Sequence, residues 1–203
     1  ISGLESVTGP ADGGPIRCGA SIADIMAGQN ALIGILAALR YREISGRGQY
    51  IDCSLVDACI VSLASMNQIY NSTGKIPTRR GNTFEATAPG NTYETKDGII
   101  SISAGQTREW PKFARCIGHP EWIEDERFVS VDRRVINRTL LDSLIEEETR
   151  KYTTADLMDI LLEYGLPAAP IYSIKDVTED EHFAGERMMF VDVEHPELGR
   201  VKI

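Results

Sequence analysis

The sequence predicts an α/β fold for its first third and an α+β arrangement for the remainder. Two apolar helical segments with a short strand between them, joined by short links, occupy the first third, an order typical of α/β proteins. The remainder begins with alternating apolar residues on both sides of Lys96-Asp97-Gly98, a hairpin signature, and continues with helical patterns. A change in composition over residues 75–90 separates these two parts.

The first part opens with a Gly- and Pro-rich loop over residues 1–23 and then becomes apolar. From Asp24 to about Arg42 nearly every residue is apolar or small, so we expect a helix that is buried on most of its faces. Glycines beyond residue 45 end it. A short strand is predicted over residues 49–53, and a second apolar helix is predicted from its cap at Ser54 to about Tyr70.

The second part follows a segment, residues 75–90, whose composition is typical of a linker or mobile loop. We expect helices packed on an antiparallel sheet. The predicted hairpin strands are residues 91–94 and 99–103; the predicted helices are 109–117, 133–150 and 154–164; further strands are predicted at 168–171 and 188–194.

Bulk properties exclude several classes of function. The net charge of -9 argues against a nucleic-acid surface, because phosphate binding needs clustered Lys and Arg. No apolar run reaches about 18 residues without a charge, and no segment has the order of a signal peptide, so we expect no membrane partner. The spacings of the four cysteines and three histidines fit no metal knuckle or disulfide framework. We therefore expect no metal and a cytoplasmic location.

One carboxylate, Asp24, stands where the first helix begins, among small residues. The helix dipole and the free amides of the first turn stabilise a charged carboxylate there. Two interpretations follow: Asp24 is an ordinary helix cap, which is the commoner case, or it is a nucleophile. Capping alone does not explain the small residues around it, which would admit a bulky ligand close to the backbone. These are Gly19, Ala20, Ala23, Ala27 and Gly28.

Other candidate motifs indicate structure rather than chemistry. Gly46-Arg47-Gly48-Gln49 lacks the spacing of a phosphate-binding loop and is interpreted as a turn. No GxSxG nucleophile elbow is present. Trp110 and Trp122 flank a helical segment and are interpreted as core or surface anchors, and Cys53 and Cys59 as small core residues.

A series of motifs in a fixed order then resembles the class III CoA-transferases, the carnitine dehydratase and bile-acid-inducible family, which also contains the 2-methylacyl-CoA racemases. The resemblance covers essentially the whole chain. Its motifs are Ser2-Gly3-Leu4 with Thr8-Gly9; Gly19, Ile22-Ala23-Asp24 and Gly28; Ile35 to Leu39; Gly46 to Leu55 with Asp57; Thr95 to Gly98; Asn137-Arg138; Gly165 to Pro170; and Glu194-His195-Pro196 with Gly199.

The resemblance implies that Asp24 is the catalytic residue. In the family, the matching Asp attacks an acyl-CoA thioester to give a mixed anhydride, and CoA then forms an aspartyl thioester that is passed to a second acid. A flexible glycine-bearing loop covers the active site in transferases, which makes Gly81 and Gly90 possible loop residues, although consecutive glycines are missing here. Coenzyme A, as acyl-CoA, is the implied cofactor, and most of its contacts are expected upstream of Ile1.

The resemblance also implies an architecture, an interlocked homodimer whose subunits each have a Rossmann-like large domain and a small α+β domain. Residues 1–74 would be the C-terminal part of the large CoA-binding domain, 75–90 a linker or active-site loop, 91–196 the small domain, and 197–203 the start of the return to the large domain. The chain begins without Met, so we expect it to be a piece of a longer protein and to be inactive alone.

Three functions remain open at this point. A CoA-transferase acting between an acyl-CoA and a carboxylic acid is preferred. A racemase would pair an Asp with a His as acid and base, and that His would lie upstream of Ile1. A non-catalytic dimerisation or binding module would use Asp24 only as a cap. The sequence does not identify the donor and acceptor acids.

Overall fold

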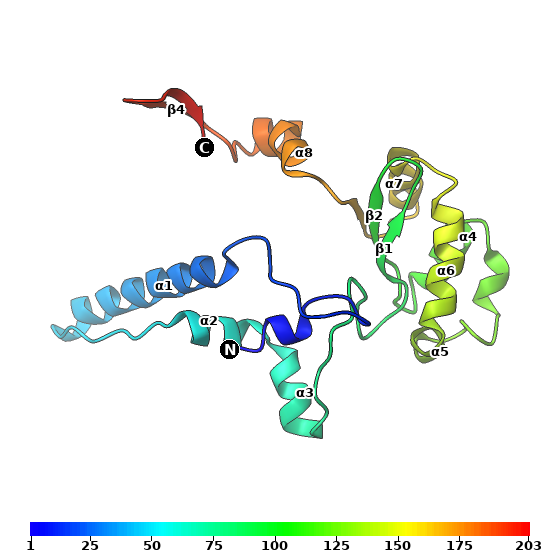
Figure 1. The fold of residues 1–203 in the computed structure, drawn as a ribbon, viewed down its shortest axis with the longest axis horizontal. Coiled ribbons are helices and arrows are strands. Elements are labelled where there is room, and N and C mark those ends of the chain that lie inside the picture. The colour runs from blue at the N-terminus through cyan, green and yellow to red at the C-terminus, as the bar shows by residue number, and fades with distance from the viewer. The chain divides into compact units, whose positions relative to one another are not determined.

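The computed structural model describes residues 1–203 and divides them into two compact units, Ile1–Thr83 and Phe84–Ile203. The first unit is helical, and the second combines helices with antiparallel strands (Figure 1). The boundary lies within residues 75–90, where the composition of the sequence changes.

The first unit contains one long helix and several short ones. Its elements are η1 (Glu5–Val7), α1 (Ile22–Ser45), α2 (Leu55–Ser62) and α3 (Ser65–Thr73). Gly46 ends α1 with a φ of 71°, a left-handed conformation that glycine adopts without a Cβ penalty, and its amide donates to the carbonyl of Arg42. Ser54 caps α2 by accepting a hydrogen bond from the amide of Asp57. The sequence predicted both features, the glycine that ends α1 and the serine that caps α2.

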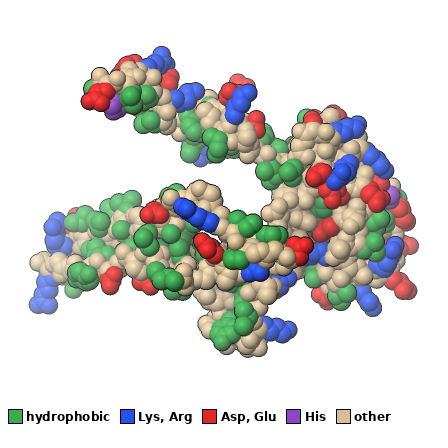
Figure 2. Space-filling model, in the orientation of Figure 1, with side chains coloured by type: hydrophobic (Ala, Val, Ile, Leu, Met, Phe, Trp, Pro, Cys, Tyr) green, Lys and Arg blue, Asp and Glu red, His purple; other side chains and the backbone are tan.

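The expectation that α1 is buried is wrong within this chain. None of its residues is buried, and large apolar side chains such as Ile33 and Ile44 are 65% and 73% exposed. Figure 2 shows hydrophobic side chains along the surface of this helix. Only α2 and the segment before it pack on α1, so one side of an apolar helix is covered. By length and composition alone α1 could also cross a membrane, a test that core helices of soluble proteins pass too.

The strand predicted at residues 49–53 is also wrong, because no neighbouring strand pairs with it. This segment instead runs back along α1 without regular structure. Ile51 approaches the backbone of Gly34, where an added Cβ would lie 3.1 Å from its Cγ2 atom. The thiol of Cys53 contacts the carbonyl of Ala27 at 3.3 Å. Cys53 is nevertheless exposed, contrary to its interpretation as a core residue, whereas Cys59 is buried as expected.

The second apolar helix is broken in two, where the sequence predicts one. Ala64 separates α2 from α3 with a φ of 44°, an uncommon conformation for a residue with a Cβ. The side-chain amide of Asn67 donates to the carbonyl of Ile60 at 2.8 Å, in addition to the amide of Leu63, so this carbonyl at the end of α2 has two donors. Neither Gly nor Pro marks this break, so periodicity alone could not locate it.

The second unit contains a three-stranded antiparallel sheet in the order β1-β2-β3, which confirms the predicted hairpin and sheet. Tyr93 pairs with Ile100, and Ile102 pairs with Ala168. The strands are β1 (Gly90–Glu94), β2 (Ile99–Ser103), β3 (Ala168–Pro170) and the separate hairpin β4 (Asp192–His195) and β5 (Gly199–Lys202). The helices are α4 (Trp110–Cys116), η2 (Pro120–Ile123), α5 (Val131–Ile136), α6 (Arg138–Thr149), α7 (Thr154–Glu163), α8 (Ile174–Glu179) and the π-helical η3 (Glu181–Glu186).

The predicted helix over residues 133–150 is likewise two helices, α5 and α6. Asn137 lies between them, and its side-chain amide donates to the carbonyls of Arg127 and Arg133. An asparagine side chain that bonds to the backbone in this way competes with the helical hydrogen-bond pattern. The break therefore depends on a contact with the loop before α5, which lies ten residues earlier in the chain.

The core of the second unit lies between the sheet and helices α4, α6 and α7. Trp110, Trp122 and Phe128 form an aromatic cluster within it, with ring centroids 6.1–6.4 Å apart. Both tryptophans are buried, in keeping with their interpretation as anchors. Further core residues include Phe113, Leu141, Ile145, Leu157 and Leu161.

A fully buried arginine, Arg134, holds three backbone segments of this unit together. Its guanidinium donates to the carbonyls of Ala88, Gly105 and Phe128 at 2.7–2.8 Å and lies over the ring of Trp110. No carboxylate contacts it, and burial lowers its pKa to about 10. The three carbonyls would otherwise be buried acceptors without a donor, which is costly. Arg134 is therefore a structural cross-link among loops that are distant in sequence.

Candidate active site

A cavity of about 840 Å³ lies within the first unit, inside the size range of small-molecule sites. Its walls come from η1 and the residues before it, the loop at residues 16–21, the first turns of α1, and α2. Its apolar side chains include Leu4, Ile16, Ile22 and Met26, and its charged ones are Glu5, Arg17 and Asp24. An apolar wall with a few charged groups is the usual composition of a binding site.

Local contacts hold the loop that forms one wall of this cavity. The amide of Ile16 donates to the carbonyl of Thr8 at 3.0 Å. The guanidinium of Arg79 donates to the carbonyls of Gly13 and Ser6 at 3.1 and 3.4 Å. Residue 79 lies in the predicted linker. This part of the linker is therefore hydrogen-bonded to the segment that forms the cavity wall.

Asp24 lines the cavity, and it is not the cap of α1. The N-cap is Ser21, and Asp24 is the third residue of the helix; no side-chain hydrogen bond caps this end. The interpretation of Asp24 as a helix cap is therefore wrong. Its carboxylate is exposed and makes no hydrogen bond or ion pair within the chain. A free carboxylate facing a cavity is available to react with a ligand bound there.

The small residues near Asp24 leave open space beside it. Gly28 is one turn further along α1, on the same face as Asp24. A Cβ atom added at Gly28 or at Gly19 would meet no other heavy atom within 4 Å. A ligand can therefore approach the backbone at this end of α1, as the composition of the segment suggested.

The other candidate residues lie elsewhere. Gly81 does not line the cavity; its amide donates to the carbonyl of Gly9 at 2.8 Å and its φ is 61°. Gly90 belongs to the second unit, where it is buried at the start of β1. No His lines the cavity, and no group of three or more His, Cys, Asp or Glu side chains is placed to hold a metal ion.

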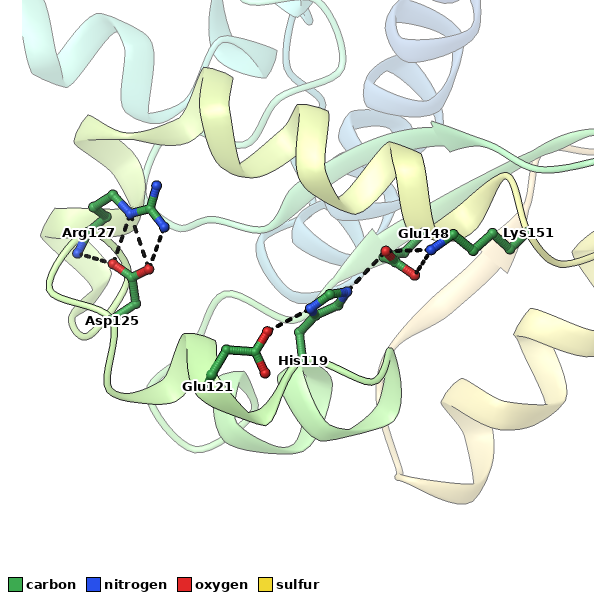
Figure 3. Close-up of polar contacts among 6 residues, drawn as sticks. All are labelled: His119, Glu121, Asp125, Arg127, Glu148 and Lys151. Atoms are coloured by element: carbon green, nitrogen blue, oxygen red, sulfur yellow. Dashed lines mark hydrogen bonds and ion pairs between the residues drawn. The ribbon is translucent and has the colours of Figure 1, made fainter.

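A separate cluster of titratable groups surrounds His119 in the second unit (Figure 3). Its Nδ1 atom lies 2.8 Å from Glu121, and its Nε2 atom lies 3.0 Å from Glu148, which also accepts from Lys151. The ring stacks on Trp122. With a carboxylate on each nitrogen, the imidazole has no free lone pair to act as a base. This cluster is an ion-pair network, not a second catalytic centre.

The cluster predicts that the stability of the second unit depends on pH. Burial by itself lowers the pKa of His119, but the hydrogen bonds to Glu121 and Glu148 outweigh it and raise the pKa above its ordinary value. A raised folded-state pKa stabilises the fold fully below the unfolded pKa of about 6.5, and this contribution is lost as pH rises through the folded value. The free energy of unfolding, from urea titrations followed by circular dichroism, should fall from pH 6 to 8.5.

The His119→Gln variant should lose this part of the pH dependence. His182→Gln is the matched control, because His182 also contacts a glutamate but is exposed and lies outside the core. The His182→Gln variant should keep the same change in the free energy of unfolding with pH as the unchanged protein. Equal slopes for the His119→Gln variant and the unchanged protein would contradict the assignment of the raised pKa to His119.

Comparison with known proteins assigns the chain to a family. Residues 1–203 match CoA-transferase family III over the whole chain. The chain belongs to this family. It is 36% identical, over its full length, to a succinyl-CoA–D-citramalate CoA-transferase from Chloroflexus aurantiacus, of which it covers 50%. It is 32% identical over 96% of its length to a succinate–glutarate CoA-transferase from Agrobacterium fabrum, of which it covers 48%.

A solved structure supports the same conclusion. The crystal structure of a CAIB/BAIF family protein from Brucella suis is 33% identical and matches with a TM-score of 0.81, over 98% of this chain and 55% of that one. The chain of this family III member thus spans about half the length of the curated relatives it matches. The family resemblance stated from the motifs is confirmed.

Sequence reasoning missed two charged residues of the cavity, Glu5 and Arg17, and Arg17 is the one that differs in sign from Asp24. It is the only Lys or Arg side chain on the cavity wall. Its guanidinium makes no hydrogen bond or ion pair within the chain. It lies in a Gly/Pro-rich loop seven residues before Asp24, and no periodicity connects the two. A cation shortly before a candidate nucleophile was the one available signal.

Proposed function

We propose that the full-length protein is a CoA-transferase that moves CoA from an acyl-CoA thioester to a carboxylic acid, with Asp24 as the nucleophile. The observation that carries this proposal is the free carboxylate of Asp24 on the wall of a cavity of about 840 Å³. Membership of CoA-transferase family III supports it, and so do the names of the curated relatives, which are CoA-transferases.

The chemistry proceeds through covalent intermediates on Asp24. Its carboxylate attacks the thioester carbonyl of the donor and displaces CoA thiolate, which gives a mixed anhydride. The thiolate then attacks the aspartyl carbonyl, forms an aspartyl-CoA thioester and releases the donor acid. The acceptor carboxylate repeats these steps in reverse, so that CoA leaves on the acceptor and Asp24 is regenerated. Splitting the transfer in this way replaces one difficult step with easier ones.

We infer that the acids are dicarboxylic. The names of these curated relatives include succinate, citramalate, mesaconate, glutarate, oxalate and malate, each of which carries two carboxyl groups; the one monocarboxylic acid named is acetate, as the donor to oxalate. Transfer is preferred to racemisation because these curated relatives are named CoA-transferases. A purely structural role for Asp24 loses its support because Asp24 caps no helix.

Chemical trapping tests the proposed mechanism. Hydroxylamine attacks anhydrides and thioesters, so it should convert Asp24 to a hydroxamate when the full-length protein is incubated with succinyl-CoA. Mass spectrometry of the peptide containing residues 18–40 should show the modified Asp24, and only when the thioester is present.

The trapping experiment has two controls. The Asp24→Asn variant should give no hydroxamate, and Asp12→Asn should be labelled at Asp24 like the unchanged protein, because Asp12 is exposed and does not line the cavity. Absence of label in a protein that exchanges the α-proton of an acyl-CoA would support the racemase instead.

A further inference from the structure

The cavity that holds Asp24 pairs its reactive carboxylate with one unused cation. Arg17 lies on the wall of the same cavity, in the loop that leads into α1. Its guanidinium makes no hydrogen bond or ion pair within the chain, although other arginines of the chain, such as Arg79 and Arg134, bond to backbone carbonyls. An arginine left free at a cavity wall has its full donor capacity available for a ligand.

We propose that Arg17 binds the distal, non-reacting carboxylate of the dicarboxylic acyl group while the other carboxyl carbon lies at Asp24. This rests on the proposed function and deepens it, because it assigns the residue that selects dicarboxylic over monocarboxylic acids. The planar guanidinium fits a carboxylate with two parallel hydrogen bonds, which gives geometric selectivity as well as affinity.

The charges on the cavity wall favour a role for this cation in binding a second carboxylate. Asp24 and Glu5 are both acidic and both line the wall, and Arg17 is the only basic side chain there. A dicarboxylate entering without a counter-charge would be repelled by two carboxylates in a site with partly apolar walls. A monocarboxylic acyl group carries no distal charge, so it neither needs Arg17 nor satisfies it.

The loop that carries Arg17 is held in place, so the backbone of this residue has a defined position at the cavity wall. The residue before it, Ile16, is bonded through its amide to the carbonyl of Thr8, and Arg79 anchors Gly13 of the same loop. Ser21 is the N-cap of α1, and the helix fixes the backbone of Asp24 in its first turn. Local backbone contacts thus set both ends of the proposed subsite within one unit.

Isotope exchange in the full-length protein tests this assignment. The rate at which labelled succinate enters succinyl-CoA is compared with the rate at which labelled butyrate enters butyryl-CoA; butyrate has a methyl group where succinate has its second carboxylate. Losing hydrogen bonds to a charged group costs about 10- to 100-fold, so Arg17→Gln should lower kcat/KM for succinate exchange by that factor. Butyrate exchange should change by less than about threefold. Arg17→Lys keeps the charge but loses the planar guanidinium with its two parallel donors. Its kcat/KM for succinate exchange should lie between those of the unchanged protein and Arg17→Gln.

The matched control is Arg40→Gln. Arg40 lies on α1 outside the cavity and pairs only with the exposed Glu43, so both exchange rates should stay within about twofold. Equal losses with both acids in Arg17→Gln would mean that Arg17 supports the fold or CoA binding, and would overturn the proposal. An unchanged succinate rate would overturn it as well.

Direct binding separates this proposal from the proposed function. Calorimetry should show that the unchanged protein binds succinate more tightly than butyrate, and that Arg17→Gln removes the difference. If the protein exchanges neither acid but its preference for succinate depends on Arg17, the transferase assignment fails and the subsite stands. If Arg17→Gln leaves the affinities for succinate and butyrate unchanged, the subsite assignment fails, whether or not the protein is an active transferase.

Discussion

Replacing Asp24 with Asn in the full-length protein should lower kcat for CoA transfer by at least about 10³-fold, because removing a covalent nucleophile has effects of this size or larger. The amide has nearly the shape of the carboxylate but neither its charge nor its nucleophilicity. Asp24 makes no hydrogen bond in the chain, so the fold should lose little stability, about 1 kcal/mol or less from the first turn of α1. Steady-state transfer assays and thermal unfolding of the same preparations measure the two effects.

Asp12→Asn is the control for this substitution. It makes the same chemical change at an exposed turn of the same unit, away from the cavity, and should leave kcat within about twofold. If Asp24→Asn retained more than a few per cent of the activity at normal stability, Asp24 would not be the nucleophile. A large loss of stability in Asp24→Asn would instead indicate a structural role that its free carboxylate does not suggest.

Replacing Arg134 with Met should destabilise the second unit by about 3–5 kcal/mol, the usual cost of removing one partner from a buried charged network. Met fills much of the volume but donates no hydrogen bond, so the carbonyls of Ala88, Gly105 and Phe128 would be buried without a donor. Both tryptophans of the 203-residue chain lie in this core. Tryptophan fluorescence during urea unfolding of this chain therefore reports the change.

The neighbouring residue supplies the matched control for Arg134. Arg133 is on the same helix, α5, but its side chain is exposed and unpaired, so Arg133→Met should change the free energy of unfolding by less than about 0.5 kcal/mol. Arg134→Lys should fall between the two, because an ammonium reaches fewer of the three carbonyls. Similar effects at positions 133 and 134 would show that the cross-link contributes little.

Much of the local structure was predictable because short-range signals encode it. Gly46 and Gly165 follow helices and adopt the positive φ that glycine permits, and Ser54 begins a helix with its side chain as cap. Lys96-Asp97-Gly98 forms the turn between β1 and β2. Each signal acts within a few residues, so the sequence alone reveals it.

Most of the failures involve partners outside the segment itself. The strand at residues 49–53 has no neighbour to pair with in this chain, and Asn137 breaks a predicted helix through a bond to Arg127. α1 has the composition of a buried helix, yet its own chain covers only one side of it. The apolar pattern of a segment shows which of its faces could be buried. It does not show whether another segment of the chain covers that face.

The sequence by itself predicted the long first helix with its glycine stop, the hairpin of β1 and β2, and the family, and it singled out Asp24 as the candidate nucleophile. The tertiary structure decided that Asp24 is a free carboxylate on a cavity rather than a helix cap, that Arg17 lies on the wall of that cavity, and that Arg134 is buried. Capping and turn signals are local, so composition and order encode them. A residue's burial, and the side chains that share its cavity, depend on segments brought together only when the chain folds.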